Sequence, residues 1–408
     1  METLNFVIVG HIDHGKSTLI GRLLYDTDSL PPDKIEEIKN TSEDLGKDTE
    51  FAYLLDHLEE ERQQGITIET TQVFFKTDKR EYVIIDAPGH VEFVKNMITG
   101  ASHAEAAILM IDASEGVKEQ TKRHTYILSL LGIKQVITVI NKMDLAEYSE
   151  GTFNSIRKDI DDFLGDVGME SAFCIPISAL KGENITKLSS AMPWYEGPTF
   201  LESLNSLKGR QPEENKPLLF PVQDVYKTDD KRVTVGRVEA GILKEGEDIK
   251  ILPHNQMTKV KTIEKYPSVV SEASSGESIG ITTEDSVFLD RGDIVCREGQ
   301  EPHFVDSFHA NIFWLSKKDF EKSEKLVIKC ATQETTCKIE RIKERINSST
   351  LEVTEENAGR LKNLEVGEVL IKTKKPIAIK TFDDVQELGR FVLVKDENTC
   401  AGGIVTSL

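Results

Sequence analysis

The fold is decided by the stretch Gly10-His11-Ile12-Asp13-His14-Gly15-Lys16-Ser17. A glycine, four further residues and Gly-Lys-Ser make up the signature of a phosphate-binding loop. The apolar run 4–9 precedes this loop, and segment 17–25 follows it with the one-sided leucine pattern of a helix. Backbone N–H groups at such a helix N-terminus converge, and the helix dipole adds positive potential there. The alternative is a chance match in a glycine-rich turn, and the flanking strand and helix patterns argue against it.

The loop supplies most of the expected nucleotide contacts. Lys16 would neutralise the β- and γ-phosphates, and the hydroxyl of Ser17 would bind Mg²⁺. The expected binding residues of the loop and the first helical turn are His11, Ile12, Asp13, His14, Gly15, Lys16, Ser17 and Thr18.

Length and composition limit the class of protein. With 408 residues, the chain should form two or three domains. No run approaches the ~20 apolar residues of a membrane span, and Met1 leads almost directly into the first strand, so we expect no membrane partner and no targeting segment. The five scattered cysteines predict a reduced, cytoplasmic protein without structural zinc. The net charge of −20 argues against broad binding to phosphate backbones.

Strand and helix patterns alternate through the first half of the chain. This alternation predicts an α/β domain, a mostly parallel sheet with helices on both faces. The expected strands after the first are 71–76, 81–86, 106–112, 135–141 and 173–177, and the main expected helices are 115–131 and 152–164. The long charged segment 31–64 interrupts the rhythm, at a position that suits a nucleotide-sensing switch.

The segment Asp86-Ala87-Pro88-Gly89-His90 follows an apolar strand. A carboxylate at the end of a strand beside a phosphate loop can hold Mg²⁺ through water, which is the role expected for Asp86. Gly89 can bring its backbone N–H to a γ-phosphate. The alternative is an ordinary turn, and the distance from the phosphate loop favours the nucleotide site.

Asn141-Lys142-Met143-Asp144 follows another apolar strand. Asp144 can accept hydrogen bonds from N1–H and the exocyclic amine of guanine, and a carboxylate there rejects adenine by ~10⁴ or more. Asn141 would brace the phosphate loop, and Lys142 belongs to the same binding set. The segment Ser178-Ala179-Leu180 can present backbone N–H groups to guanine O6. The expected ligands are therefore GTP and GDP with Mg²⁺.

With these motifs and Gly65-Ile66-Thr67-Ile68, the chain resembles the translation-factor class of GTPases throughout its length. The resemblance implies that Thr67 reaches Mg²⁺ and the γ-phosphate. It also implies that His90 orients the attacking water, with Ile12 and Ile66 as an apolar gate. The implied catalytic set is His90, Thr67 and Lys16, and the implied metal set is Ser17, Thr67 and Asp86.

The second half of the chain changes character after the polar linker 208–217. Short glycine-punctuated strands predict two small antiparallel β-barrels, and Asp229-Asp230 supplies a hairpin turn. The expected strands of the first barrel are 220–225, 233–238, 249–252, 260–263, 278–282 and 293–296, and those of the second are 310–315, 326–331, 338–342, 369–372, 376–380, 391–394 and 403–406. Lys317-Lys318 and Lys374-Lys375 are small basic runs, a pattern more typical of a solvated face than of a binding site. The expected domains are a P-loop GTPase domain at 1–210, one barrel at 211–303 and a second barrel at 304–408. The resemblance assigns the barrels to contact with partners.

Two subgroups of this class fit the chain. Gln64 before Gly-Ile-Thr-Ile, and the segments 276–281 and 312–315, look like the large GTPase subunit of sulfate adenylyltransferase. That resemblance implies coupling of GTP hydrolysis to adenylyl sulfate synthesis from ATP and sulfate by a small catalytic adenylyltransferase subunit. The alternative is an elongation- or termination-type factor, of the elongation factor 1-alpha and Tu kind, that binds aminoacyl-tRNA or a release partner at the ribosome. The His-Ile-Asp-His of the loop and segment 221–226 favour this alternative.

Overall fold

The structure is a computed structural model that describes residues 3–30, 71–87, 104–209, 214–228, 231–321 and 324–408. The chain divides into two compact units, residues 1–210 with 348–350, and residues 211–347 with 351–408. The predicted boundary between two barrels at 303/304 stays a prediction. Several predicted features lie outside the described residues: the insertion 31–64, Ile66, Thr67, Gly89, His90 and the turn Asp229-Asp230.

A six-stranded sheet forms the centre of the first unit, in the order β2-β3-β1-β4-β5-β6. Strands β1, β3, β4, β5 and β6 run parallel, and β2 at the edge is antiparallel to β3. The mostly parallel sheet is therefore as predicted. Its strands are β1 (Thr3–Gly10), β2 (Thr71–Lys76), β3 (Glu81–Asp86), β4 (Ala106–Asp112), β5 (Gln135–Asn141) and β6 (Ser171–Pro176).

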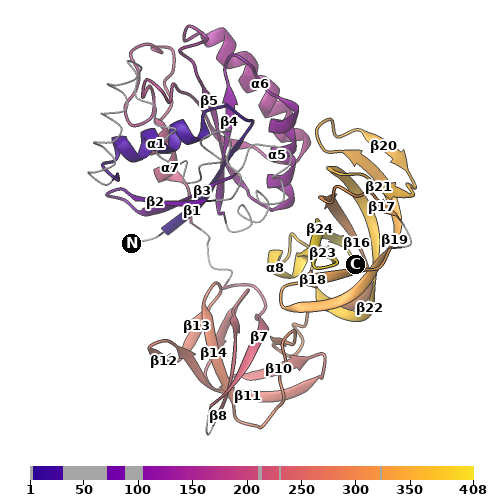
Figure 1. Cartoon of the computed structure of the whole chain (residues 1–408). Coiled ribbons are helices and arrows are strands. Elements are labelled where there is room, and N and C mark those ends of the chain that lie inside the picture. Colours follow the sequence, from indigo (N-terminus) through magenta and orange to yellow (C-terminus); the bar gives the residue numbers. More distant parts are fainter. Residues whose placement is uncertain (1–2, 31–70, 88–103, 210–213, 229–230, 322–323) are drawn as a thin grey trace. The chain divides into compact units, whose positions relative to one another are not determined.

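Helices cover both faces of this sheet (Figure 1). Apolar residues of α1 and α7 share one buried cluster with alternate residues of β1, such as Phe6 and Ile8. Period-2 alternation in β1 and period-3.6 alternation in α1 bring these side chains to one face. Strand β4 is buried on both faces, as expected for the middle of a parallel sheet. The helices described here are α1 (Lys16–Asp26), α5 (Glu119–Leu130), α6 (Glu150–Asp166) and α7 (Phe200–Ser206).

The start of α5 differs from the sequence prediction, which began the helix at Glu115. The backbone N–H and hydroxyl of Ser114 donate to the carboxylate of Asp112 over 2.7 and 2.6 Å, which closes a turn instead. Gly116 continues that turn with a φ of 71°, and Lys118 is extended. The helix can therefore begin only at Glu119, because left-handed and extended residues do not propagate an α-helix.

The second unit contains two antiparallel barrels. In the first, β10-β15-β7-β8-β14-β11 closes through pairing of β10 with β11, and β12 extends the sheet beyond β11. Three short strands, β9, β12 and β13, were not predicted, because three-residue strands are too short to show an alternating pattern. The strands are β7 (Leu219–Thr228), β8 (Lys231–Arg237), β9 (Ile242–Lys244), β10 (Asp248–Leu252), β11 (Gln256–Lys265), β12 (Ser268–Val270), β13 (Glu272–Ser274), β14 (Ser278–Thr283) and β15 (Ile294–Cys296).

The second barrel closes in the same way, through pairing of β18 with β19 in the order β18-β23-β24-β16-β22-β19. Buried alternate residues of these strands, including Phe308 and Ile371, fill its interior. Its elements are β16 (His303–Trp314), β17 (Phe320–Glu321), β18 (Leu326–Cys330), β19 (Gln333–Asn347), β20 (Val353–Glu356), β21 (Arg360–Leu361), β22 (Glu365–Ile379), α8 (Gln386–Gly389), β23 (Arg390–Lys395) and β24 (Asn398–Ser407). Among the described residues, no helix combines the length and apolar character needed to cross a membrane.

Candidate functional site

The carboxyl ends of the parallel strands bring the predicted motifs to one edge of the sheet. Gly10 ends β1, Asp86 ends β3, and Asp112 and Asn141 end β4 and β5. The register pairs Ile8 with Asp86 and Asp112 with Asn141. Because parallel strands finish at the same edge, loops that follow them in sequence meet in space, and ligands in such sheets bind there.

The loop between β1 and α1 depends on Gly15. This residue caps α1 with a φ of 89°, a left-handed conformation that glycine adopts without strain. A Cβ at this position would lie 2.4 Å from the side-chain nitrogen of Asn141. The glycine therefore serves two purposes, the turn itself and the close approach of β5.

Lys16 lies inside the loop rather than reaching into solvent. Its ammonium donates to the carbonyl oxygens of Gly10 and His11 over 3.2 and 3.1 Å, and the residue is 8% exposed. Burial lowers the pKa of Lys16, and the nearby carboxylate of Asp86 opposes that shift. A lysine charge held at a helix N-terminus can attract a phosphate group.

Asn141 joins three of the predicted motifs. Its side-chain NH₂ donates to the carbonyl oxygen of His14 over 2.9 Å, and its side-chain oxygen accepts from the backbone N–H of Ala179 over 2.9 Å. The Ala179 N–H belongs to the segment 178–180, which is predicted to present backbone N–H groups to guanine O6, and it has a partner within the protein. Ser178 and Ala179 are buried, whereas Leu180 is exposed.

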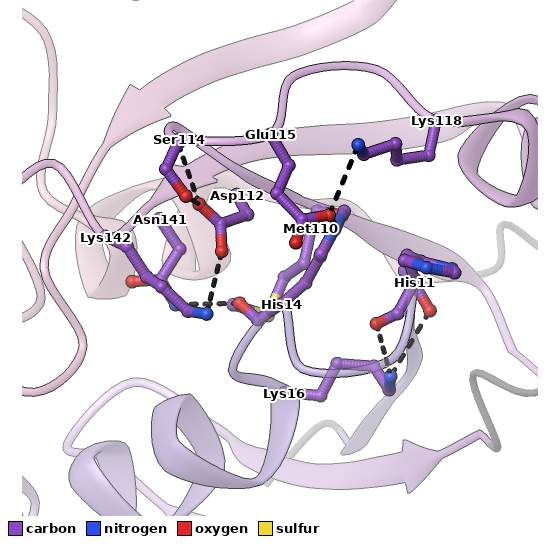
Figure 2. Close-up of polar contacts among 11 residues, drawn as sticks. His11, His14, Lys16, Met110, Asp112, Ser114, Glu115, Lys118, Asn141 and Lys142 are labelled. Carbon is purple, nitrogen blue, oxygen red and sulfur yellow. Dashed lines mark hydrogen bonds and ion pairs between the residues drawn. The ribbon is translucent and has the colours of Figure 1, made fainter. Parts of the chain in front are cut away.

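His14 anchors the loop to β4 (Figure 2). Its Nδ1 lies 3.0 Å from the carbonyl oxygen of Met110, and its Nε2 lies 3.6 Å from the carboxylate of Glu115. Glu115 also lies 3.6 Å from the ammonium of Lys118. Burial lowers the pKa of His14, which favours the neutral ring, although the hydrogen bond to Met110 acts in the opposite direction.

Sequence reasoning missed Asp112, which is buried beside the site. Its carboxylate lies 2.7 Å from the ammonium of Lys142 and accepts two hydrogen bonds from Ser114 (Figure 2). The feature that could have identified Asp112 is its place at the end of β4, since β4 lies between β1 and β5, and predicted motifs follow both of those strands.

The remaining predicted residues divide by exposure. His11, Ile12, Ser17, Thr18 and Asp144 are partly buried, and Asp13 is exposed. Thr67, Gly89 and His90 lie outside the described residues, so their predicted roles stay predictions.

Comparison with known proteins agrees with this arrangement. The family described as Elongation factor Tu GTP binding domain matches residues 1–198, and GTP-eEF1A C-terminal domain-like matches residues 307–406. Elongation factor 1-alpha of Thermoplasma acidophilum is 40% identical over 98% of this chain and 96% of its own length. The protein of the same name from Methanopyrus kandleri is 38% identical over 100% of this chain and 98% of its own length.

The chain belongs to the translation-factor family of GTPases. A solved structure of sup35 complexed with GMPPNP covers 100% of this chain and 94% of its own at 24% identity, with a TM-score of 0.46. The match to the GTP-binding domain family and the 40% identity to elongation factor 1-alpha confirm the predicted family and its GTPase chemistry. The narrower prediction of a sulfate adenylyltransferase subunit gains no support from these relatives, which carry the name of its alternative.

Proposed function

We propose that this translation-factor GTPase is an elongation-type factor that binds aminoacyl-tRNA in its GTP state and releases it after GTP hydrolysis. The observation that carries the proposal is likeness to elongation factor 1-alpha over 98% of the chain, barrels included. The same relatives favour a role in elongation over a role in termination, because they are named elongation factor 1-alpha.

The nucleotide site of the proposal rests on the ends of the parallel strands. Lys16 and the N-terminus of α1 bind the phosphates, while Asp144 and Lys142 bind guanine. Asn141 supports this assignment, because its two 2.9 Å hydrogen bonds hold the phosphate loop against the loop that contains Ala179. One polar side chain thereby fixes the distance between the phosphate and base ends of the site.

The residues present suit Mg²⁺ at the phosphate end. The hydroxyl of Ser17, at the start of α1, and the buried carboxylate of Asp86 are the oxygen ligands that Mg²⁺ prefers. Bound there, the ion would neutralise phosphate charge. Thr67 is the proposed third ligand and His90 the proposed water-orienting residue, both from the resemblance alone.

Sulfate activation remains the competing hypothesis for the function of this chain. It requires a small catalytic adenylyltransferase subunit, and no contact of the described residues favours that partner over RNA. The cytoplasmic location and the tRNA and ribosome partners belong to the elongation proposal, because they follow from the family.

The proposal is tested by binding of aminoacyl-tRNA to the purified chain. We expect tight binding with a non-hydrolysable GTP analogue, and weaker binding with GDP or with deacylated tRNA. Lys16→Ala should remove the difference between the two nucleotides because it removes the charge that binds the phosphates. If the wild-type chain binds aminoacyl-tRNA equally well with the GTP analogue and with GDP, and binds deacylated tRNA just as tightly, the elongation function is contradicted. If the chain instead stimulates a small catalytic subunit to synthesise adenylyl sulfate, sulfate activation replaces elongation as the proposed function.

A further inference from the structure

Lys142 has an unusual backbone conformation for a lysine. Its φ is 61°, in the left-handed region, where a residue with a Cβ is strained. The residue stands directly after β5, within Asn141-Lys142-Met143-Asp144. Strain of this kind persists only where neighbouring contacts hold it, and it is concentrated at functional sites.

Asp112 supplies the contact that holds Lys142. The carboxylate lies 2.7 Å from the ammonium, and the Asp112 side chain is only 3% exposed. The register of β4 and β5 places Asp112 opposite Asn141, and the backbone N–H of Ala113 donates to Asn141 over 2.8 Å. The pair therefore lies at the end of two hydrogen-bonded strands, where neither backbone can shift easily.

Ser114 fixes the orientation of the carboxylate. Its backbone N–H and its hydroxyl donate to one carboxylate oxygen, while the other oxygen faces Lys142. Burial alone would raise the pKa of Asp112, but the hydrogen bonds from Lys142 and Ser114 outweigh it and lower the pKa. Asp112 thus stays ionised beside the lysine at neutral pH.

The conformation of Lys142 also controls the position of Asp144. The backbone N–H of Leu145 donates to the carbonyl oxygen of Lys142 over 2.9 Å, which closes a turn around Asp144. On the other side of the turn, the N–H of the buried Met143 donates to Ile177 over 3.1 Å. A change at Lys142 is therefore transmitted to the carboxylate two residues later.

From this chain of contacts we infer that Asp112 is a positioning residue for guanine recognition, acting through Lys142 on Asp144. The inference rests on the proposed nucleotide site and deepens it. Asp112 touches no nucleotide atom in this scheme. Its role is to hold the turn in the conformation that presents Asp144 to N1–H and to the exocyclic amine of the base.

The test compares the affinities of the full chain for GDP and IDP by calorimetry. Hypoxanthine keeps N1–H but lacks the exocyclic amine, so only GDP uses both oxygens of Asp144. In Asp112→Asn, GDP affinity should fall about tenfold, as when a hydrogen bond to a charged group is removed, and IDP affinity should fall less. A purely structural role would weaken both nucleotides equally and leave the ratio of their affinities unchanged, which would overturn the inference.

Two further variants separate the mechanism from general damage. In a Lys142→Met background, Asp112→Asn should have little further effect on GDP affinity, because Asp112 acts through that lysine. Additive losses would contradict the inference. Asp161→Asn is the matched control, since it removes a carboxylate that pairs with Arg157 at 3.4 Å on the exposed surface of α6. It should change neither affinity.

Folding and the proposed function are checked separately. If Asp112→Asn does not fold, Asp112→Glu keeps the charge but displaces the ammonium, and it should reduce the preference for GDP over IDP in the same way. An unchanged preference in that variant would overturn the inference. If wild-type chain binds neither nucleotide, the proposed function fails, whatever the variants do.

Discussion

The side-chain amide of Asn141 donates to the backbone carbonyl oxygen of His14 over 2.9 Å, and so the end of β5 holds the phosphate loop. The same side chain accepts from Ala179. Asn141→Ala leaves two buried backbone groups without their partner, at about 1–3 kcal/mol each. We expect the free energy of unfolding to fall by about 2–6 kcal/mol and GDP affinity to fall with it. Denaturant unfolding and calorimetry measure the two effects.

The control for Asn141 is Asn154→Ala, which removes the same amide from an exposed position on α6. It should be nearly neutral for both stability and affinity. A similar loss in the two variants would show that the contact with His14 has no special role.

Gly15 offers a test of the loop conformation. Gly15→Ala places a Cβ 2.4 Å from Asn141 in a residue whose φ is 89°, so both the backbone and β5 must shift. We expect GDP binding to be lost and the melting temperature to decrease. Gly165→Ala is the matched control, because a Cβ there meets nothing within 4 Å inside α6. That change should stabilise the protein by up to about 1 kcal/mol. Retained GDP binding in Gly15→Ala would contradict the proposed geometry.

The sheet could be predicted from sequence because its strands are apolar runs bounded by polar turns. The bounds of β2, β3, β4 and β5 agree with their predicted ranges for that reason. Strand β22 was predicted as two strands, 369–372 and 376–380, because the polar run 373–375 and Pro376 interrupt the pattern. The structure continues one strand through them, since β16 pairs with both segments and absorbs the irregularity between Val305 and Ser307.

The candidate site was predictable where a motif has a fixed spacing and unpredictable where a side chain is selected by tertiary contacts. Gly15 and Lys16 belong to the first kind. Asp112 belongs to the second, because its role depends on the register of β4 with β5 and on the φ of Lys142. Neither property can be derived from the residues near Asp112 in the sequence.

Stability should depend on pH through the buried His124. Burial lowers the pKa of His124 from 6.5 to about 3. Between those values the unfolded chain binds a proton that the folded chain does not, so stability is complete above pH 6.5 and is lost as the pH falls. This histidine should reduce the free energy of unfolding by about 1 kcal/mol between pH 6 and pH 5. His124→Gln should abolish that part of the pH dependence.

The two tryptophans allow this measurement within one unit. Trp194 lies in the first unit and Trp314 in the second, so Trp314→Phe leaves a fluorescence reporter of the unit that contains His124. If the free energy of unfolding depends on pH equally steeply in wild type and in His124→Gln, the ring of His124 does not gain a proton on unfolding.

Base selection should change in a defined direction with Asp144→Asn. An amide can donate to the 2-oxo group of xanthine, where a carboxylate repels it, so preference should move from GTP to XTP. Competition binding with the two nucleotides measures the change. Preserved guanine preference would remove Asp144 from the proposed site. Glu147→Gln, an exposed acid in the following turn, is the control and should leave the preference unchanged.

The last prediction concerns RNA binding by a chain with a net charge of −20. Such a chain can bind tRNA only through local basic surfaces. In the second barrel, Lys372 faces Lys338 across the β19–β22 register, and Lys372, Lys374 and Lys375 are exposed. Like charges directly opposite each other repel and destabilise a sheet, so a bound polyanion would reduce the repulsion between these lysines. The sequence alone suggested a solvated face for Lys374 and Lys375.

Charge reversal distinguishes the two interpretations. Lys372→Glu with Lys375→Glu should weaken aminoacyl-tRNA binding and reduce the slope of log affinity against log salt by about 0.9 for each phosphate that the protein no longer neutralises. Lys325→Glu with Lys329→Glu changes the net charge equally at other exposed positions of the same barrel. If the second pair weakens binding as much as the first, net charge alone accounts for the effect. If only the first pair does, the face of β22 contacts the RNA backbone.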